Sequence, residues 1–295
     1  MSGREDREGF SARGETGELR RVLVHEPGTE IQSVIDPDAR DWDGLPRLKR
    51  VVKEHHELVA ELEARGVEVV ELGDVPEKLA DALFVRDVGF AVEGGTVVGR
   101  MAGPGRRGEE HVLTERMVGL GTPIYHTVHG PGRFEAGNAV WLDRETVVVG
   151  RSRTANAAGI AQIRNVLDTY GIDVIEVPLF GSTKSSGRTH LALVFGMVAT
   201  DLALVYPQAV PTDFRDRLES RGIETIEVGM REQRNRVTSS VVTEPGRVLL
   251  AAGNPETADK LRAKGVDVTE LDVREIGKAG GGLKGLVLPL KRADP

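Results

Sequence analysis

The sequence predicts an α/β fold of five repeated ββαβ units, arranged as five small mixed sheets around an axis with helices outside. The first observation is a short β-branched, acidic strand led by a glycine, which recurs at Gly66, Gly171, Gly222 and Gly265, with a worn copy at Gly121. In chain order the glycines are 55, 50, 51 and 43 residues apart (121−66, 171−121, 222−171, 265−222). Self-similarity at this period is the signature of a repeat architecture.

A helical pattern precedes each repeated glycine. The clearest is Leu48–Ala64, where apolar residues follow i, i+3, i+4 spacing and Gly66 then supplies a left-handed C-cap. Comparable helices are expected at Glu109–Gly119, Asn156–Thr169, Thr212–Ser220 and Pro255–Ala263.

Two further strand signals joined by a turn follow the glycine-led strands. No strand follows the last inner strand, Leu286–Leu290, that could pair with it, and the N-terminal strand Arg21–Val24 has no repeat unit of its own. We therefore expect these two strands to pair and close a ring. An ordinary open α/β sheet is the alternative, but it would not carry a hairpin in every unit. The expected hairpins are Phe84–Val92 with Thr96–Gly99, Ala139–Leu142 with Thr146–Val149, Leu191–Val198 with Leu202–Tyr206, and Val237–Thr243 with Arg247–Ala251.

Composition is that of a soluble globular protein, with 39% hydrophobic and 29% charged residues among 295. No apolar run approaches the length of a membrane span, and a net charge of −7 argues against nucleic acid as the main partner. We interpret residues 1–18 as a flexible N-terminal segment without a signal-peptide core, and residues 19–295 as a single domain of catalytic type. A cytoplasmic location follows as the expectation, and a homodimer is left open.

The chain contains no cysteine, which excludes disulfides, cysteine metal sites and a thiolate nucleophile. The glycine run Gly280–Gly282 lacks the following helix that a phosphate-binding loop requires. Five histidines show no ligand spacing, so neither a metal nor a cofactor is expected: His55, His56, His111, His126 and His129.

In a radial fold, the start of each inner hairpin strand points at the central channel, so equivalent positions should converge. Most of these positions carry polar or ionisable side chains, which are costly to bury unless they are paired. Two carboxylates and an imidazole around one pocket suit a planar cationic ligand such as a guanidinium. The positions are Arg86–Asp87, Gly137–Asn138 just after Glu135, Thr189–His190, Ser239–Ser240 and Lys284–Gly285.

Over residues 19–292 the chain resembles the guanidino-group-modifying (pentein) superfamily, which contains arginine deiminases, dimethylarginine dimethylaminohydrolases and amidinotransferases. The resemblance implies a five-bladed α/β propeller. It rests on these segments, in order and in register with the repeat: Arg21–Pro27, Glu54–His55, Phe84–Asp87, Phe134–Asn138, Arg151–Thr154, His190–Leu191 and Gly280–Gly285.

The resemblance also implies roles for individual residues. Asp87 would grip the guanidinium, Glu135 would bind the substrate nitrogens, and His190 would be the general acid/base. Arg153 matches a position near the substrate's carboxylate in some members. The further candidates for substrate binding are Arg86, Asn138 and Lys284.

The chain departs from the superfamily pattern at three places. The nucleophilic cysteine should follow the glycine-rich tail motif, but Gly285 stands there and excludes a covalent thiouronium intermediate. Ala192 replaces an aspartate that arginine deiminases use as a further guanidinium ligand. Asn138 stands where an aspartate is frequent.

Three functions remain open. The first is a hydrolase-like enzyme that acts on a guanidino or related amino acid by non-cysteine acid/base chemistry, with C–N bond hydrolysis or elimination. The second is a pseudoenzyme that binds such a ligand or regulates an active paralogue, and the third is a structural scaffold. His190 favours the enzyme, although a buried structural histidine is the alternative.

Other residues keep two interpretations each. Lys284 is interpreted as an electrostatic stabiliser or an amine nucleophile, and the alternative interpretation is an ordinary solvated cation. Ser239 and Ser240 are nucleophiles or hydrogen-bonding caps. The segment Gly181–Gly187 is a mobile lid over the site or a plain surface loop.

Overall fold

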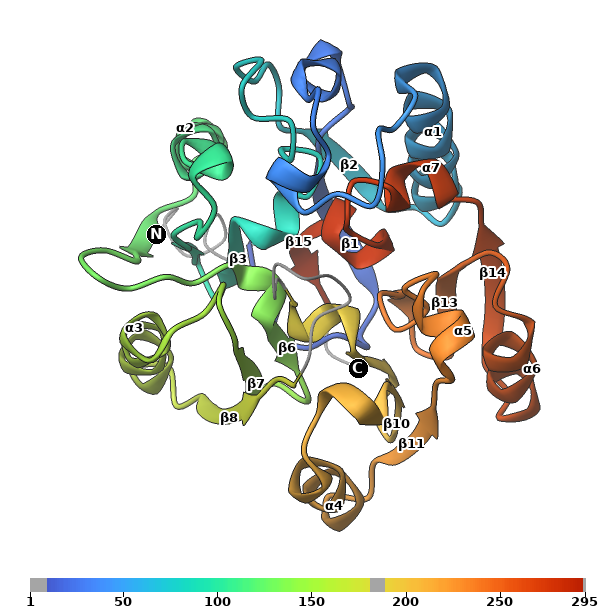
Figure 1. The fold of residues 1–295 in the computed structure, drawn as a ribbon. Helices are drawn as coiled ribbons and strands as arrows, with labels where there is room; N and C mark the ends of the chain where they lie inside the picture. Colours follow the sequence, from blue (N-terminus) through green and yellow to red (C-terminus); the bar gives the residue numbers. More distant parts are fainter. Residues whose placement is uncertain (1–9, 181–188, 294–295) are drawn as a thin grey trace.

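The computed structural model describes residues 10–180 and 189–293, which form five three-stranded sheets radiating from a central axis (Figure 1). The expected segment Gly181–Gly187 lies outside the described residues. The sheets contain β1 (Leu19–Val24), β2 (Glu68–Glu71) and β15 (Leu288–Arg292); β3 (Gly89–Val92), β4 (Gly95–Val98) and β5 (Ile124–Thr127); β6 (Ala139–Trp141), β7 (Thr146–Arg151) and β8 (Asp173–Pro178); β9 (Phe195–Ala199), β10 (Leu202–Val205) and β11 (Glu224–Glu227); β12 (Val241–Glu244), β13 (Arg247–Ala251) and β14 (Asp267–Leu271).

The long helices lie on the outside of the ring, one beside each sheet (Figure 1). Their bounds agree with the sequence-based expectation to within one residue at each end. The repeated glycines adopt the left-handed conformation that was predicted for Gly66, where φ is 77°. The helices are α1 (Leu48–Ala64), α2 (Glu109–Gly119), α3 (Ala157–Asp168), α4 (Thr212–Ser220) and α6 (Pro255–Ala263), with the short α5 (Met230–Gln233) and α7 (Arg274–Gly277).

The N-terminal and C-terminal strands close the ring, as predicted. Strand β1 pairs antiparallel with β15, with Leu23 opposite Leu288, and parallel with β2 on its other side. The same antiparallel-then-parallel pattern recurs in every sheet. The open-sheet alternative is wrong, because the described strands form five separate sheets of three.

Four of the five inner strands, β3, β9, β12 and β15, begin later than expected, whereas β6 begins at Ala139 as predicted. Single turns of 3-10 helix precede four of the inner strands, at Val85–Asp87, Ala136–Asn138, Leu191–Leu193 and Leu283–Leu286. The polar residues of the site lie within these turns or, like Glu135 and His190, directly before them. A tight turn reorients the backbone at the axis, so that polar side chains converge there while the following apolar residues enter the sheet. These turns, and not the strand ends themselves, therefore position the candidate site.

Each blade buries its apolar residues between its sheet and its outer helix. In the first blade, Val51, Leu58 and Leu62 of α1 pack in one cluster with Val22 and Val24 of β1, all fully buried. This burial of a helix stripe against a sheet face is what the i, i+3, i+4 pattern predicted.

The N-terminal segment differs from the expected flexible lead-in over residues 10–18. Phe10 and Ala12 are buried, Ser11 forms a β-bridge with Lys291, and the carboxylate of Glu15 lies in the interior. This segment is ordered because its apolar groups cover one sheet and Glu15 pairs with buried cations. Within the described residues, none of the helices combines the length and apolar character that a membrane span requires.

The β1–β15 closure should carry a large share of the stability. Leu23→Ala removes a fully buried side chain that packs against Leu288 and Leu290, and we expect it to lower the free energy of unfolding by about 2–5 kcal/mol. Urea unfolding measures this loss. The same substitution at Leu45, whose side chain is 47% exposed, is the matched control, and an equal loss in both variants would contradict the closure.

Candidate functional site

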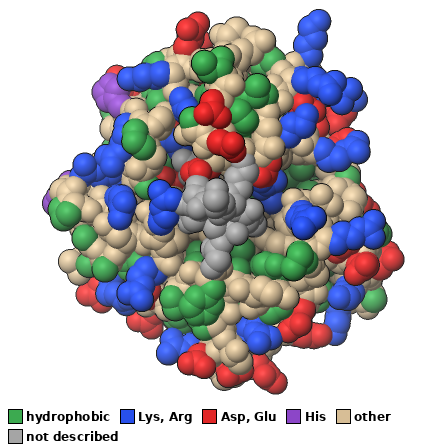
Figure 2. Space-filling model, viewed as in Figure 1, with side chains coloured by type: hydrophobic (Ala, Val, Ile, Leu, Met, Phe, Trp, Pro, Cys, Tyr) green, Lys and Arg blue, Asp and Glu red, His purple; other side chains and the backbone are tan. Residues whose placement is uncertain are grey.

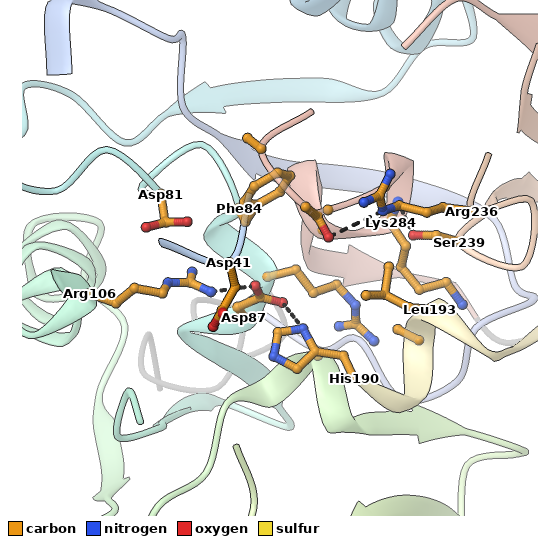
Figure 3. A pocket seen from close by; sticks show the side chains of 18 of the residues that line it. Asp41, Asp81, Phe84, Asp87, Arg106, His190, Leu193, Arg236, Ser239 and Lys284 are labelled. Atoms are coloured by element: carbon orange, nitrogen blue, oxygen red, sulfur yellow. Dashed lines mark hydrogen bonds and ion pairs between the residues drawn. The ribbon is translucent and has the colours of Figure 1, made fainter. Parts of the chain in front are cut away.

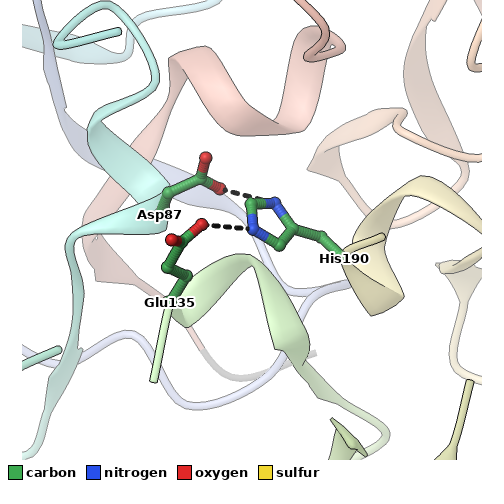
Figure 4. Close-up of side chains that lie close together, drawn as sticks. All are labelled: Asp87, Glu135 and His190. Atoms are coloured by element: carbon green, nitrogen blue, oxygen red, sulfur yellow. Dashed lines mark hydrogen bonds and ion pairs between the residues drawn. The ribbon is translucent and has the colours of Figure 1, made fainter. Parts of the chain in front are cut away.

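Asp87, Glu135 and His190 meet at the axis of the ring, although they come from three different blades (Figure 4). Nδ1 of His190 lies 3.2 Å from Oδ1 of Asp87, and Nε2 lies 2.7 Å from Oε2 of Glu135. All three side chains are buried. The structure thus brings together the three residues that the sequence predicted as catalytic.

Backbone hydrogen bonds and one glycine shape the turn that carries Glu135. The Glu135 amide donates to the carbonyl oxygen of Thr154 at 2.9 Å, and the Asn138 amide donates back to the carbonyl oxygen of Glu135 at 3.0 Å. A Cβ at Gly137 would lie 2.4 Å from Oδ1 of Asp87 and 2.7 Å from Nδ1 of His190. Only glycine therefore lets the Asp87–His190 pair approach this backbone.

The two carboxylates hold His190 in its charged form. Burial by itself lowers the pKa of the imidazole, but the negative charges of Asp87 and Glu135 and the hydrogen bonds to them raise it to about 9. Each ring nitrogen then carries a proton and donates a hydrogen bond to a carboxylate. At neutral pH His190 is a hydrogen-bond donor and a potential acid, and it is not a base.

Arg106 completes this cluster and was missed in the sequence. Its Nη1 lies 2.8 Å from Oδ2 of Asp87 and 3.6 Å from Oε2 of Glu135. Its Nε and Nη2 bind both oxygens of Glu109 at 2.7–3.1 Å. The guanidinium is 2% exposed, so these pairs are shielded from solvent. The guanidinium of Arg106 therefore forms a buried ion pair with Asp87.

These partners also set the charge of Asp87. Although burial raises the pKa of this carboxyl, His190 and Arg106 lower it well below its usual range. No local sequence signal marks Arg106, which lies in the loop before α2, and Glu109 resembles an ordinary acidic residue in the first turn of a helix. Only the fold brings both residues to the axis.

A second buried charge cluster contains Arg86 and Lys284. Nη2 of Arg86 lies 2.8 Å from Oε1 of Glu15, and Nζ of Lys284 lies 3.2 Å from Oε2 of the same carboxylate. Arg292 is buried beside them. Glu15 and Arg292 were missed because neither lies at one of the repeated axial positions from which the candidate residues were chosen.

Two predicted substrate-binding residues do not reach the central pocket. The fully buried side-chain amide of Asn138 donates to the Glu135 carbonyl oxygen at 3.1 Å and to Oγ1 of Thr154 at 2.8 Å, so it holds the turn in place. Arg153 is exposed to solvent and is not among the residues that line the pocket. Its role near a ligand carboxylate stays a prediction.

The central pocket opens beside the two charge clusters (Figure 3). In the space-filling view, acidic side chains border the centre of the same face (Figure 2). Glu135 does not line the pocket and lies behind His190. The lining residues are Asp41, Asp43, Asp81, Phe84, Arg86, Asp87, Arg106, Gly137, His190, Ala192, Leu193, Arg236, Ser239, Ala279, Gly280, Gly281, Gly282, Lys284 and Gly285.

The wall of the pocket at Gly285 is crowded by an aromatic ring. A Cβ built at Gly285 would lie 3.1 Å from Cδ1 of Phe84, and one at Gly281 would lie 2.1 Å from Cε1 of the same ring. Nearby, Oγ of Ser239 accepts a hydrogen bond from the Lys284 amide at 3.2 Å, which is the capping role. A side chain at position 285 would require Phe84 to move.

Asp87, Glu135 and His190 are also of metal-ligand type, and their ligand atoms all lie within 4.8 Å of one another. Metal binding would have to displace both hydrogen bonds of His190, because each ring nitrogen already faces a carboxylate. It would also place a cation beside the Arg106 guanidinium. The donor set therefore fits the imidazolium and guanidinium of the chain itself better than a metal ion.

A ring of five ββαβ blades with carboxylates and a histidine at its axis defines an α/β propeller of the guanidino-modifying type. The family model for "N,N dimethylarginine dimethylhydrolase, eukaryotic" matches residues 39–292, and the chain belongs to this family, within the pentein superfamily. The protein YkgA of Bacillus subtilis is 30% identical over 284 residues, which cover 96% of this chain and 95% of that protein.

Two enzymes share the fold or sequence of this chain at lower identity. The dimethylarginine dimethylaminohydrolase of Pseudomonas aeruginosa is 23% identical over 255 residues, covering 86% of this chain and 94% of that enzyme. The structure of a cysteine-to-serine mutant of that enzyme with citrulline has a TM-score of 0.77 at 21% identity, covering 92% and 99% of the two chains. The N-terminal domain of the cyanobacterial arginine dihydrolase ArgZ, bound to substrate, has a TM-score of 0.79 at 21% identity, covering 92% and 98%. These two structures share the fold.

The charge on His190 should make stability depend on pH. Its pKa of about 9 in the folded protein exceeds the ordinary histidine value of 6.5, so the stabilisation is full below pH 6.5 and disappears as the pH rises through 9. A shift of this size corresponds to about 3 kcal/mol. We expect the difference in unfolding free energy between wild type and His190→Asn to shrink by about that amount from pH 6 to pH 10. Denaturant titration at several pH values measures it.

The control for this experiment is His111→Asn, which removes an exposed imidazole from α2. A His190→Asn difference that does not change with pH would contradict the imidazolium assignment.

Arg106 should be needed for stability. Arg106→Met leaves Asp87 and Glu109 without their common cation in the interior, and breaking a buried ion pair costs about 3–5 kcal/mol. We expect a loss of that size in urea unfolding. Arg247→Met breaks a solvent-exposed pair with Glu244 and should cost less than about 1 kcal/mol. Equal losses in the two variants would refute the role of Arg106.

Proposed function

We propose that this chain binds a guanidino or related amino acid in its central pocket without covalent attack on the ligand. The observation that carries the proposal is the pocket wall at Gly285, which has no side chain and is crowded by the ring of Phe84. The 295 residues include no cysteine that could replace the missing nucleophile. A thiouronium intermediate therefore cannot form.

The charged residues of the pocket support recognition of such a ligand. Asp87 already holds the guanidinium of Arg106 at 2.8 Å, so its carboxylate is placed and ionised as a guanidinium ligand requires. The structures of two relatives hold citrulline and the substrate of an arginine dihydrolase, which supports a guanidino or related amino acid as the ligand. A structural scaffold would have no need for so many buried charges at the axis.

Arg106 sets a condition on this binding. Nη1 of Arg106 already donates a hydrogen bond to Oδ2 of Asp87. A ligand guanidinium must therefore share the Asp87 carboxylate with Arg106 or displace Arg106 from it. Oδ1 of Asp87 faces His190 instead. Binding at Asp87 is therefore coupled to the position of Arg106.

A second candidate function is turnover by acid–base chemistry, which His190 favours. Its raised pKa of about 9 means that the imidazolium lining the pocket can give a proton to a departing amine. In that reaction the oxygen of water bonds to the guanidinium carbon and the C–N bond breaks. The amine takes the proton of His190, one proton of the water returns to the imidazole, and the other is released to solvent as the carbonyl group of the product forms. A cytoplasmic location and a homodimer stay predictions in either case.

Calorimetric titration with arginine, methylated arginines, citrulline, ornithine and guanidino acids tests the proposal. We expect at least one guanidino amino acid to bind, without release of ammonia, amine or citrulline. Asp87→Asn should weaken that binding about 10-fold or more, because it removes a charge-assisted contact worth about 1.5–3 kcal/mol. The surface variant Asp213→Asn is the control, and far-UV circular dichroism checks the folding of both.

The two candidate functions give opposite results in the product assay. If the wild type releases product and the His190→Asn variant does not, the protein catalyses acid–base turnover and is not a binding protein alone. Absence of binding by the whole panel would exclude both.

A further inference from the structure

A second cavity, called here the side cavity, adjoins the central pocket. It has a volume of about 550 Å³, which is in the range of small-molecule sites. It lies between the end of α5, the helix α7, the end of β13 and the glycine-rich tail motif. Figure 1 shows α5, α7 and β13 on one side of the axis. Neither Asp87 nor His190 lines the side cavity, so it is a separate site.

Cations outnumber carboxylates in the lining of the side cavity. Arg274 pairs with Asp272 at 2.6 Å, just outside the lining. Lys278 pairs in the same way with Glu275 at 2.8 Å. With these two carboxylates counted, four cations still face three carboxylates. The charged residues of the lining itself are Arg234, Arg236, Arg274, Lys278 and Asp43.

The wider surroundings keep this positive excess. Glu54 acts on Arg274 and is a fourth carboxylate, but it is buried and accepts the backbone amides of Glu275 and Ile276. Lys53 and Arg47 are two further cations, which act on the carboxylates of the two pairs. Six cations then face four carboxylates.

The cations of the side cavity are accessible to a ligand. Arg234 is exposed, and within the described residues its guanidinium makes no ion pair or hydrogen bond. The side chains of Arg274 and Lys278 are 80% and 36% exposed, so their ion pairs are weak and can be exchanged for a ligand. Ala251 and Val273 are buried beneath them and give the cavity an apolar floor.

Arg236 joins the side cavity to the central pocket, because it lines both (Figure 3). Its guanidinium pairs with Asp43, and its Nε donates to the carbonyl oxygen of Gly280 at 3.2 Å. Its φ of 55° is left-handed, which is uncommon for a residue with a side chain, and such strained backbone clusters at ligand sites. A ligand in the side cavity would compete with Asp43 for this guanidinium.

We infer that the side cavity is a second binding site, which takes a compact oxyanion, either free phosphate or the phosphate group of a small metabolite. Guanidinium and ammonium groups only donate, and their charge-assisted hydrogen bonds match the acceptors of an oxyanion. The whole chain carries a net charge of −7, so its average field repels anions. Binding of phosphate therefore requires a local excess of cations such as the one in this cavity.

Calorimetric titration with inorganic phosphate and with glycerol 3-phosphate tests the site, with chloride at equal ionic strength as the blank. We expect the wild type to bind at least one of them. Arg234→Met and Lys278→Met should each weaken that binding about 5-fold, because each removes one accessible cation. Arg231→Met is the matched control, because it removes an exposed cation of α5 that does not line the cavity, and it should keep the affinity.

A further variant tests the cavity and leaves its charges in place. Ala252 is a half-buried residue of the lining, so Ala252→Phe should fill part of the space and abolish phosphate binding. Far-UV circular dichroism and the unfolding midpoint check that this variant folds. Ala252→Leu, with a smaller side chain, replaces it if the spectrum changes.

The affinities of the two compounds identify the source of the phosphate. Tighter binding of inorganic phosphate assigns the free ion, and tighter binding of glycerol 3-phosphate assigns a phosphorylated metabolite.

Four results would overturn the site. Neither compound binds, or Arg231→Met loses as much affinity as Arg234→Met, which would indicate the general surface charge. Binding that all the cavity variants retain would place the phosphate elsewhere. Binding that the cation variants weaken and Ala252→Phe retains would place it outside the cavity. None of these results bears on the proposed function, because no guanidino ligand is present in the titrations.

Discussion

Charge compensation at a dry axis is the constraint on which the rest of the structure depends. The blades place their polar turns around one point in the interior, and a charge that is buried there is costly unless it has a partner. Asp87 and Glu135 share Arg106 and His190, and the approach of these groups requires the bare backbone of Gly137. The same constraint orders residues 10–18, because Glu15 is needed beside buried cations.

The axis holds a frame of paired charges, and glycine stands at position 285, where the resemblance to the superfamily places a nucleophilic cysteine. Phe84 fills the space next to Gly285, and Arg106 holds the carboxylate that a ligand guanidinium would use. Ionised groups held in fixed positions can orient and select a ligand without any nucleophile. This combination explains why a member of the dimethylarginine dimethylhydrolase family is proposed to bind its ligand non-covalently.

Much of the fold could be predicted because its cause is local. The left-handed glycine after each helix, the apolar stripe of α1 and the short hairpins are each encoded within some 20 residues, and fivefold repetition reinforces the signal. Closure by β1 and β15 followed from counting strands without partners. The 3-10 turns ahead of the inner strands were not predicted, because a single turn leaves no periodicity in the sequence.

The sequence by itself determined the ring of repeats, the meeting of Asp87, Glu135 and His190, and the loss of the nucleophile at Gly285. The ring and the meeting of the three side chains follow from equivalent positions in a repeat. The loss of a nucleophile at Gly285 is what the resemblance to the pentein superfamily implies. Only the tertiary structure decided that Arg106 rests on Asp87 and that Glu15 faces Arg86 and Lys284. Such pairs join residues from different parts of the chain, and the long-range electrostatics of a buried site follows from the packing of the blades, which no local pattern records.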